Sequence, residues 1–313
     1  MSEMQIPVEH MFTIVMEKRN EGRHDYVGPF GRRIFEKARG GTVTGKRFNG
    51  TVLDLHATDY GRASLDGSIR QFDADMGLQA DDGTAVLVQY RGRMSPKYGP
   101  GRSCIQLLFE VQEGPHGWLN DIQAIGYGEE KPDGSILFEV YALTGAAEFE
   151  GPAQGADVSP ADRTSVTADF LLRRKSEHTP GSTRHTVMSP LGQRYFTLAE
   201  AGGAFAGPRV AGQFLSGYAW SPHRMNVKGE PGSAGFEMLM HYDVKTLLQA
   251  DDGTPILMSY TGASSAAYLG GSWMTATLFE VPEGPHAWLN EVQAIGVGRW
   301  AGDGSEYKVY ALR

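Results

Sequence analysis

The sequence predicts an all-β protein built from two tandem antiparallel β-barrels, and three observations support this prediction. A long segment of the chain is repeated almost unchanged, apolar and polar residues alternate in short runs, and Asp-Gly dipeptides stand between those runs. Alternation with a period of two is the signal of half-buried strands. Asp-Gly supplies the positive φ that tight hairpin turns require. Closure into barrels would remove the exposed strand edges.

The repeat is clearest in the segment LFEVQEGPHGWLNDIQAIGYG, Leu108 to Gly128. It returns as LFEVPEGPHAWLNEVQAIGVG, Leu278 to Gly298, with 16 of 21 positions identical. Two copies this similar must each form a foldable unit. The predicted domains are therefore 1–145 and 168–313, which form a pseudo-dimer within one chain. Residues 146–167 are rich in small and turn-forming residues and are expected to form a linker.

The individual strands are predicted from runs such as TAVLVQYRG, TPILMSYTG and SEYKVYALR. Turns are expected at Asp82-Gly83, Asp133-Gly134, Asp252-Gly253 and Asp303-Gly304. A short helix is expected near Gly117 to Gln123. Long helical periodicity is rare in the sequence, so a mostly antiparallel fold follows.

Composition narrows the classes of function. The formal net charge is −8, from 29 basic and 37 acidic residues, which argues against nucleic acid as a partner because phosphate binding needs clustered Lys and Arg. The run Arg173, Arg174, Lys175 is typical of a solvated face. No segment approaches a membrane-spanning length or resembles a signal peptide, so we expect a cytoplasmic protein without a membrane partner.

No metal and no cofactor are expected. Cys104 is the single cysteine, which excludes an intramolecular disulfide, and we expect it to be a structural, small apolar residue rather than a nucleophile. The sequence has no zinc-site spacing, Gly-rich dinucleotide motif, P-loop or nucleophile elbow. Cofactor-free chemistry or simple binding of a small molecule remains.

Both copies resemble one family, the uncharacterised bacterial and fungal domain of unknown function 3237. The resemblance rests on the order of a GG-x-F/V-x-G-x-R segment, a DDG hairpin, F-E followed by W-L-N, and a final V-Y strand. The matching residues in the first copy are Gly40, Gly41, Gly45, Arg47, Asp82, Gly83, Phe109, Glu110, Trp118, Leu119, Asn120 and Tyr141. The resemblance implies a lipocalin-like β-barrel that binds a small metabolite, and it implies no defined activity.

The strand before each DDG turn offers candidate proton-transfer groups. Asp73 and Asp75 share one face of the strand in the first copy, and His241, Asp243 and Lys245 share the same face in the second. If that face lined the barrel interior, neighbouring charges would separate their pKa values and permit acid–base chemistry. A solvated outer face explains the same pattern.

The two copies also differ at the barrel rim. The first copy has Asp59 and Arg93, whereas the second reads Tyr218-Ala219-Trp220 and Ala263 at those places. Asp59 or Asp73 could then move a proton while Arg93 holds an oxygen of the substrate. A rim ion pair between Arg93 and Asp59 is the structural alternative.

The repeated Trp-Leu-Asn motif is expected to form a structural corner, and the alternative is a ligand contact at the mouth of the cavity. In that alternative the binding residues would be Trp118, Asn120, Trp288 and Asn290, since Trp walls and amide donors suit an aromatic ligand. Tyr260, from the aromatic-rich part of the second copy, would add to an apolar pocket. The aromatic residues of the second copy also suit an interface between domains.

The sequence therefore favours a cofactor-independent acid–base enzyme, a lyase, isomerase or cyclase, acting on a small, largely apolar metabolite inside a β-barrel. Two alternatives stay open at this point. One is a non-catalytic carrier of a hydrophobic small molecule. The other is a pseudo-dimer whose groove, and not its cavities, binds the partner. Association of two chains into a homodimer is a separate open question, and the fused pair lessens the need for it.

Overall fold

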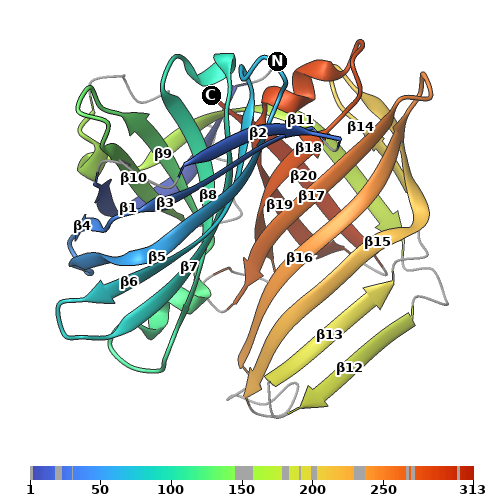
Figure 1. Ribbon diagram of the computed structural model, residues 1–313. Coiled ribbons are helices and arrows are strands. Elements are labelled where there is room, and N and C mark those ends of the chain that lie inside the picture. The colour runs from blue at the N-terminus through green and yellow to red at the C-terminus, as the bar shows by residue number, and fades with distance from the viewer. Residues whose placement is uncertain are drawn as a thin grey trace. The chain divides into compact units, whose positions relative to one another are not determined.

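The computed structural model describes residues 3–17, 23–29, 31–144, 158–177, 183–189, 192–198, 203–228, 237–265, 268, 272–301 and 304–313. In these residues the regular structure consists of β-strands and a few short 3-10 helices (Figure 1). The prediction of an all-β chain with two antiparallel barrels is confirmed.

Eight of the described strands close the first barrel. They pair in the ring order β1, β10, β9, β8, β7, β6, β5, β4 and back to β1, and every pairing is antiparallel. Their bounds are β1 Glu3–Met16, β4 Gly41–Thr44, β5 Gly50–Ala63, β6 Arg70–Ala80, β7 Ala85–Met94, β8 Arg102–Val111, β9 Ala124–Glu130 and β10 Ile136–Leu143. A hairpin of β2 (His24–Gly28) and β3 (Gly31–Ala38) extends the far half of β5.

The second barrel repeats this arrangement over the described part of the second copy. Its ring order is β11, β20, β19, β18, β17, β16, β15, β14 and back to β11. The bounds are β11 Ser165–Glu177, β14 Gly203–Ala206, β15 Ala211–Lys228, β16 Glu237–Ala250, β17 Pro255–Ser264, β18 Trp273–Glu280, β19 Gln293–Ala301 and β20 Gly304–Leu312. The hairpin of β12 (Thr183–Ser189) and β13 (Gly192–Leu198) pairs with β15.

The described residues divide into two compact units. Of the described residues, the unit that holds the first barrel takes 7–143, 158–166 and 313, and the other takes 3–6, 144 and 167–312. Short 3-10 helices lie between strands. They are η1 Pro96–Tyr98, η2 Gly117–Asp121, η3 Pro160–Asp162 and η5 Ala287–Glu291. The helix expected near Gly117 to Gln123 is thus a single 3-10 turn.

Strand alternation positions the core of each barrel. On β6 the side chains of Phe72, Ala74 and Met76 are buried in the interior, whereas Asp73 and Asp75 are exposed on the outer face. Aromatic contacts close one end of the first barrel, where the Phe12 ring lies 5.6 Å from Phe48 and 6.0 Å from Phe109 between ring centroids. Apolar burial on the inner face is what favours a closed sheet.

The Asp-Gly turns follow the prediction where the structure describes them. Gly83 and Gly253 have φ of 90° and 87°, and the Asp side chain before each glycine accepts a hydrogen bond from the backbone N–H that follows the glycine. These bonds and the left-handed glycine set the register of each hairpin. Asp303 of the fourth predicted turn lies outside the described residues.

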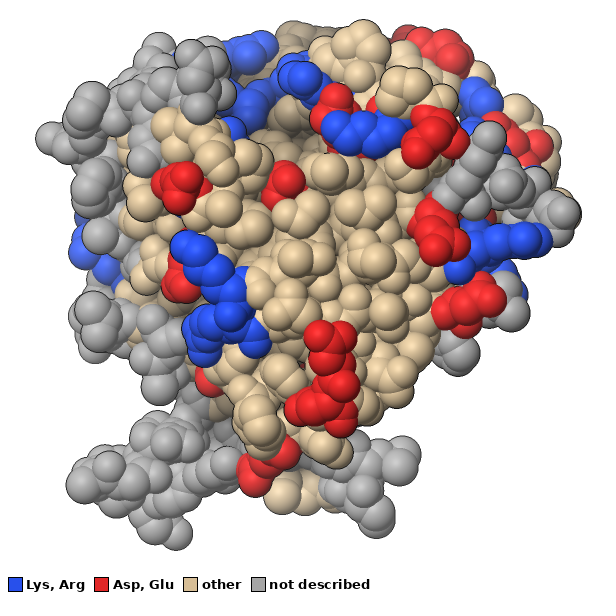
Figure 2. All heavy atoms as spheres, turned by 90° about the vertical axis from the view of Figure 1, so that its left-hand side faces the viewer, with Lys and Arg blue, Asp and Glu red and all other residues tan. Residues whose placement is uncertain are grey.

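Surface charge is mixed. Figure 2 shows a face on which basic and acidic side chains stand in small separate groups over a largely uncharged surface. Within the described residues no helix is both long enough and apolar enough to cross a membrane.

Candidate functional site

The Trp-Leu-Asn motif closes one end of each barrel. In the first copy the Asn120 amide accepts a hydrogen bond from the backbone N–H of Val111 and donates one to its carbonyl, both at 2.9 Å. Asn290 makes the same pair of bonds to Val281 at 2.9 and 2.8 Å. Both amides are thus used by the backbone, which supports the structural role of the motif.

The tryptophans of the motif stack on arginines in the same way in both copies. The Arg47 guanidinium carbon lies 3.8 Å from the Trp118 ring centroid, and Arg209 lies 3.7 Å from that of Trp288. Such cation–π contacts stabilise a partly exposed corner. Because the geometry is repeated, it does not distinguish one barrel from the other.

The strand before the first DDG turn directs its acidic groups outward. Asp73 is exposed and forms an ion pair with Arg91, whose Nε lies 3.1 Å from Oδ1 of Asp73. Asp75 is exposed as well. Both carboxylates therefore lie on the opposite face of β6 from the barrel interior, so the structure does not bring the carboxylate of Asp73 together with that of Asp59. Only the backbone N–H of Asp73 contacts Asp59, donating a hydrogen bond of 3.0 Å to its Oδ1.

The corresponding residues of the second copy lie on the same outer side of β16. Lys245 is exposed and Asp243 is half-buried, whereas His241 is buried. The inner side of this strand carries Val244 and Thr246, both of them buried. The row of His241, Asp243 and Lys245 is thus separated from the interior of the second barrel by the sheet.

Arg93 is buried, but by strand alternation it lies on the opposite face of β7 from Val88 and Tyr90, which face the interior. Cys104 is its partner on the neighbouring strand β8 and lies on the same face of the sheet. Burial raises the pKa of the Cys104 thiol, which makes this residue a poor nucleophile and agrees with the expected structural role.

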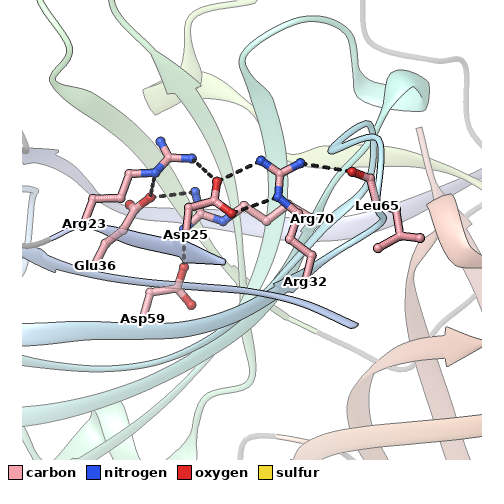
Figure 3. A network of polar contacts seen from close by, with 7 residues as sticks. All are labelled: Arg23, Asp25, Arg32, Glu36, Asp59, Leu65 and Arg70. Carbon is pink, nitrogen blue, oxygen red and sulfur yellow. Dashed lines mark hydrogen bonds and ion pairs between the residues drawn. The ribbon is translucent and has the colours of Figure 1, made fainter. Parts of the chain in front are cut away.

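The first barrel holds a buried charge cluster formed by Glu36, Asp59 and Arg70. Nη2 of Arg70 donates to Oδ2 of Asp59 at 2.6 Å, and Nη1 donates to Oε1 of Glu36 at 3.1 Å. Figure 3 shows these side chains converging from β3, β5 and β6. Less than a tenth of each residue's surface is exposed. Nε of Arg70 is buried and has no hydrogen-bond partner in the described part of the chain.

A chain of surface charges leads to this cluster (Figure 3). Nε of Arg23 lies 3.2 Å from Oε1 of Glu36, and Nη2 of Arg23 lies 3.6 Å from Asp25. Arg32 donates two hydrogen bonds of 2.8 Å to the carboxylate of Asp25. Positive and negative groups alternate along the whole network, which connects the buried Arg70 with the partly exposed hairpin of β2 and β3.

The pKa values in this cluster reflect burial first. Burial raises the pKa of Asp59 above its ordinary value, although Arg70 and the backbone N–H of Asp73 act to lower it. Burial acts to lower the pKa of Arg70, but the two carboxylates outweigh it and the net direction is upward. Asp59 is therefore a carboxyl group that is easier to protonate than usual and is held beside a permanent cation.

The second barrel has neutral residues at all three positions. Arg70 corresponds to Met240 in the repeat register that aligns Leu108 with Leu278. In the second barrel, β15 and β16 keep one register from the pair Trp220 and Lys245 to the pair Arg224 and His241, so Ser221 lies opposite Val244. Val244 corresponds to Ala74 in the repeat register, and in the first barrel Asp59 lies opposite Ala74. The equivalent of Asp59 is thus Ser221, which directly follows the Tyr218–Trp220 segment that the sequence comparison indicated.

The equivalent of Glu36 in the second copy is Thr197, because Glu36 pairs with Asp59 and Thr197 pairs with Ser221.

The sequence alone did not point to Glu36 and Arg70 as site residues. A usable signal was present: Arg70 shares strand parity with Phe72 and Ala74, so it continues an apolar face. A charged residue on such a face indicates a buried ion pair or a site.

Tyr260 is the one candidate binding residue that reaches a barrel interior away from the Trp-Leu-Asn corner. Its ring lies 5.6 Å from that of Tyr307, and burial raises the pKa of both hydroxyl groups.

The basic run Arg173, Arg174, Lys175 was expected to form a solvated face, and this expectation is wrong for Arg174. Strand alternation directs that residue into the second barrel, where burial lowers the pKa of its guanidinium.

Several solved structures are similar to about half of this chain. A β-barrel-like protein of Acinetobacter baumannii is 21% identical with a TM-score of 0.39, covering 44% of this chain and 96% of that chain. A conserved protein of unknown function from Rhodopseudomonas palustris is 20% identical with a TM-score of 0.38, covering 44% and 97%. An enzyme from Penicillium herquei is 21% identical with a TM-score of 0.34, covering 43% and 95%.

No curated protein matches this chain. The family model described as "Protein of unknown function (DUF3237)" matches it twice, over residues 6–143 and 165–312. These two segments hold the two closed barrels, and they include the charge cluster of the first copy and the Trp-Leu-Asn corner of both. The chain therefore belongs to the DUF3237 family, as two tandem copies of its domain.

Proposed function

We propose that the protein is a cofactor-independent acid–base enzyme, a lyase, isomerase or cyclase, that acts on a small, largely apolar metabolite in the first barrel. Asp59 would transfer the proton, and Arg70 would bind the oxygen on which negative charge develops. Glu36 would position Arg70. The sequence suggested Asp73 and Arg93 beside Asp59; the exposure of Asp73 and the strand face of Arg93 favour Arg70 and Glu36 instead.

The observation that carries the proposal is the carboxyl group of Asp59. It lies on the interior face of a barrel, its pKa is raised by burial, and the second barrel has Ser221 in its place. General acids and bases work best when their pKa lies near the operating pH, and burial is one way in which enzymes raise that of a carboxyl group. A purely structural ion pair would not need to differ between two barrels of the same fold.

The chemistry follows from the two groups. The ionised Asp59 can accept a proton from an acidic carbon or hydroxyl of the substrate, and the electron pair left behind moves toward an oxygen. Nε of Arg70 has no hydrogen-bond partner among the described contacts and is a donor for that oxygen. The protonated Asp59 can then return the proton at another position or to a leaving group, so that no redox partner is required.

The surroundings support an apolar substrate. The guanidinium carbon of Arg70 lies 4.8 Å from the ring centroid of Phe72, and Tyr90 and Phe138 have ring centroids 6.3 Å apart in the same interior. Aromatic walls exclude water and strengthen the electrostatic interactions of a buried ion pair. The same apolar lining favours the alternative function, a carrier that binds a hydrophobic compound without converting it.

The test uses 5-nitro-1,2-benzisoxazole, a small apolar aromatic compound whose ring opens when a base removes its C3 proton. The N–O bond breaks, and the product is a coloured phenolate. We expect turnover by the wild type above that of acetate at the same concentration. Asp59→Asn should reduce the rate by at least about 100-fold, whereas Asp73→Asn, which removes an exposed carboxylate on the other face, should leave it unchanged.

The outcomes separate the candidates. Wild-type turnover no faster than acetate, or equal turnover by Asp59→Asn, would reject Asp59 as the base. Loss of activity in Asp73→Asn alone would favour the outer face of β6. Saturable binding of the benzisoxazole without turnover would favour the carrier.

A further inference from the structure

The interior of the second barrel carries a polar group of residues where the first barrel has an apolar core. Ile14 pairs with Phe138 on β1 and β10, and the equivalent pair on β11 and β20 is Arg174 with Tyr307. The repeat register that aligns Leu108 with Leu278 also sets Thr275 and Thr277 at the places of Ile105 and Leu107. Four apolar positions have therefore become polar. They lie on β11 and β20, which pair with each other, and on β18, which β19 separates from β20.

Three of these residues form a hydrogen-bonded group. The hydroxyl of Tyr307 lies 2.6 Å from Oγ1 of Thr275 and 3.1 Å from Oγ1 of Thr277, and all three side chains are buried. Gly296 makes room for it, because a Cβ atom there would lie 2.0 Å from the Tyr307 hydroxyl oxygen. The Tyr260 ring packs 5.6 Å from that of Tyr307.

Arg174 completes the group. Its guanidinium carbon lies 4.2 Å from the ring centroid of Phe214, and it interacts electrostatically with Tyr260 and Tyr307. Burial lowers the pKa of Arg174, and the two tyrosines act in the opposite direction. A negative charge bound beside the guanidinium would act in the same direction as the tyrosines.

These replacements are costly for folding alone. A cation and three hydroxyl groups inside a barrel lose hydration, whereas the first barrel closes the same fold with Ile, Leu and Phe at these positions. Natural sequences depart from apolar packing chiefly where a site requires it. The group therefore indicates a binding site rather than a requirement of the fold.

We propose that the interior of the second barrel binds a small aromatic carboxylate, with its anionic oxygens at Arg174 and the Tyr307 hydroxyl and its ring against Tyr260 and Phe214. Arginine suits this role because its planar guanidinium matches the two oxygens of a carboxylate. The aromatic side chains give the ring of the ligand a flat apolar surface. This site is separate from the acid–base cluster of the first barrel and does not depend on the function proposed there.

The test measures the binding of 2-naphthoate by titration calorimetry, with 2-naphthamide as the uncharged analogue of the same shape. The wild type should bind the acid at least about tenfold more tightly than the amide. Arg174→Ile and Tyr307→Phe copy the first barrel and should each weaken naphthoate binding, Arg174→Ile by at least about tenfold. Arg91→Ile, which removes one positive charge from the exposed outer face of β6 and β7, should bind naphthoate as the wild type does.

Several results would overturn the proposal. They are the absence of naphthoate binding by the wild type, equal binding of the acid and the amide, and unchanged binding by a folded Arg174→Ile protein. If Arg174→Ile does not fold, Tyr307→Phe together with Arg174→Lys decides, because unchanged naphthoate affinity in both would also reject the site. Asp59→Asn is expected to keep naphthoate binding, so failure of one proposal leaves the other testable.

Discussion

Arg70 donates a 2.6 Å hydrogen bond from Nη2 to Oδ2 of Asp59, and the second barrel has Met240 and Ser221 at these positions. The same fold therefore closes with and without this buried ion pair. A pair that the fold does not require is expected to cost stability when one partner alone is removed, because the other charge remains buried. Removing all its members together should restore most of that loss.

Arg70→Met copies the second barrel and leaves Glu36 and Asp59 buried without their shared cation. We expect the free energy of unfolding to fall by about 3 kcal/mol at neutral pH, measured by urea denaturation. The matched control is Arg91→Met, which breaks the exposed pair with Asp73 and should cost less than about 1 kcal/mol.

The triple variant Glu36→Thr, Asp59→Ser, Arg70→Met replaces the whole cluster by its counterparts from the second barrel. It should regain at least half of the stability lost in Arg70→Met, because no uncompensated charge remains inside the barrel. A triple variant less stable than Arg70→Met would mean that the cluster is needed for packing.

The pH dependence of stability tests the raised pKa of Asp59. Burial lifts that pKa above 3.8, so the folded chain binds the proton more tightly than the unfolded chain. The resulting stability is fully present below pH 3.8 and is lost as the pH rises through the folded-state pKa. We expect the free energy of unfolding of the wild type to fall relative to Asp59→Asn over this range. Denaturant titrations of both proteins at a series of pH values measure the difference; a relative rise with pH would show that Arg70 outweighs burial.

The Trp-Leu-Asn corner should behave as scaffold in both barrels. Asn120→Ala and Asn290→Ala each leave a backbone N–H and a carbonyl of one residue, Val111 or Val281, without the amide partner. Each substitution is expected to lower the free energy of unfolding by about 1–3 kcal/mol. Thermal and urea unfolding check the cost. A ligand-binding role would appear instead as weaker binding of 2-naphthoate or the benzisoxazole at unchanged stability.

The repeat, the strand alternation and the Asp-Gly turns were sufficient to predict the two barrels, because these features are local in sequence. The site residues were harder to predict, since alternation gives two faces without saying which one is inside. Asp73 and Asp75 form the more polar face of β6, and this face is the outer one. Arg70 and Arg174 continue faces that are otherwise apolar, so their charges concealed their position inside the barrels.

Comparing the two copies in sequence also could not predict which residues pair across neighbouring strands. Glu36 and Asp59 are neighbours only because β3 pairs with the far half of β5, although β4 and its turns separate these two strands along the chain. The register of β15 with β16 then shows that Ser221 replaces Asp59. The difference between the two barrels thus became visible at the level of strand register rather than of motif.

Gly296 provides a steric test of the second barrel. A methyl group there would lie 2.0 Å from the Tyr307 hydroxyl oxygen and 2.3 Å from Oγ1 of Thr275, so Gly296→Ala must displace the Tyr307 side chain. We expect a loss of about 1–3 kcal/mol in the free energy of unfolding together with weaker binding of 2-naphthoate. Gly126→Ala is the matched control in the first barrel, where the methyl would lie 2.9 Å from Cγ1 of Ile105. It should also destabilise the chain but leave naphthoate binding unchanged, because overpacking alone does not touch Arg174 or Tyr307. Equal loss of binding in both variants would show that naphthoate affinity follows global stability and not the geometry of this group.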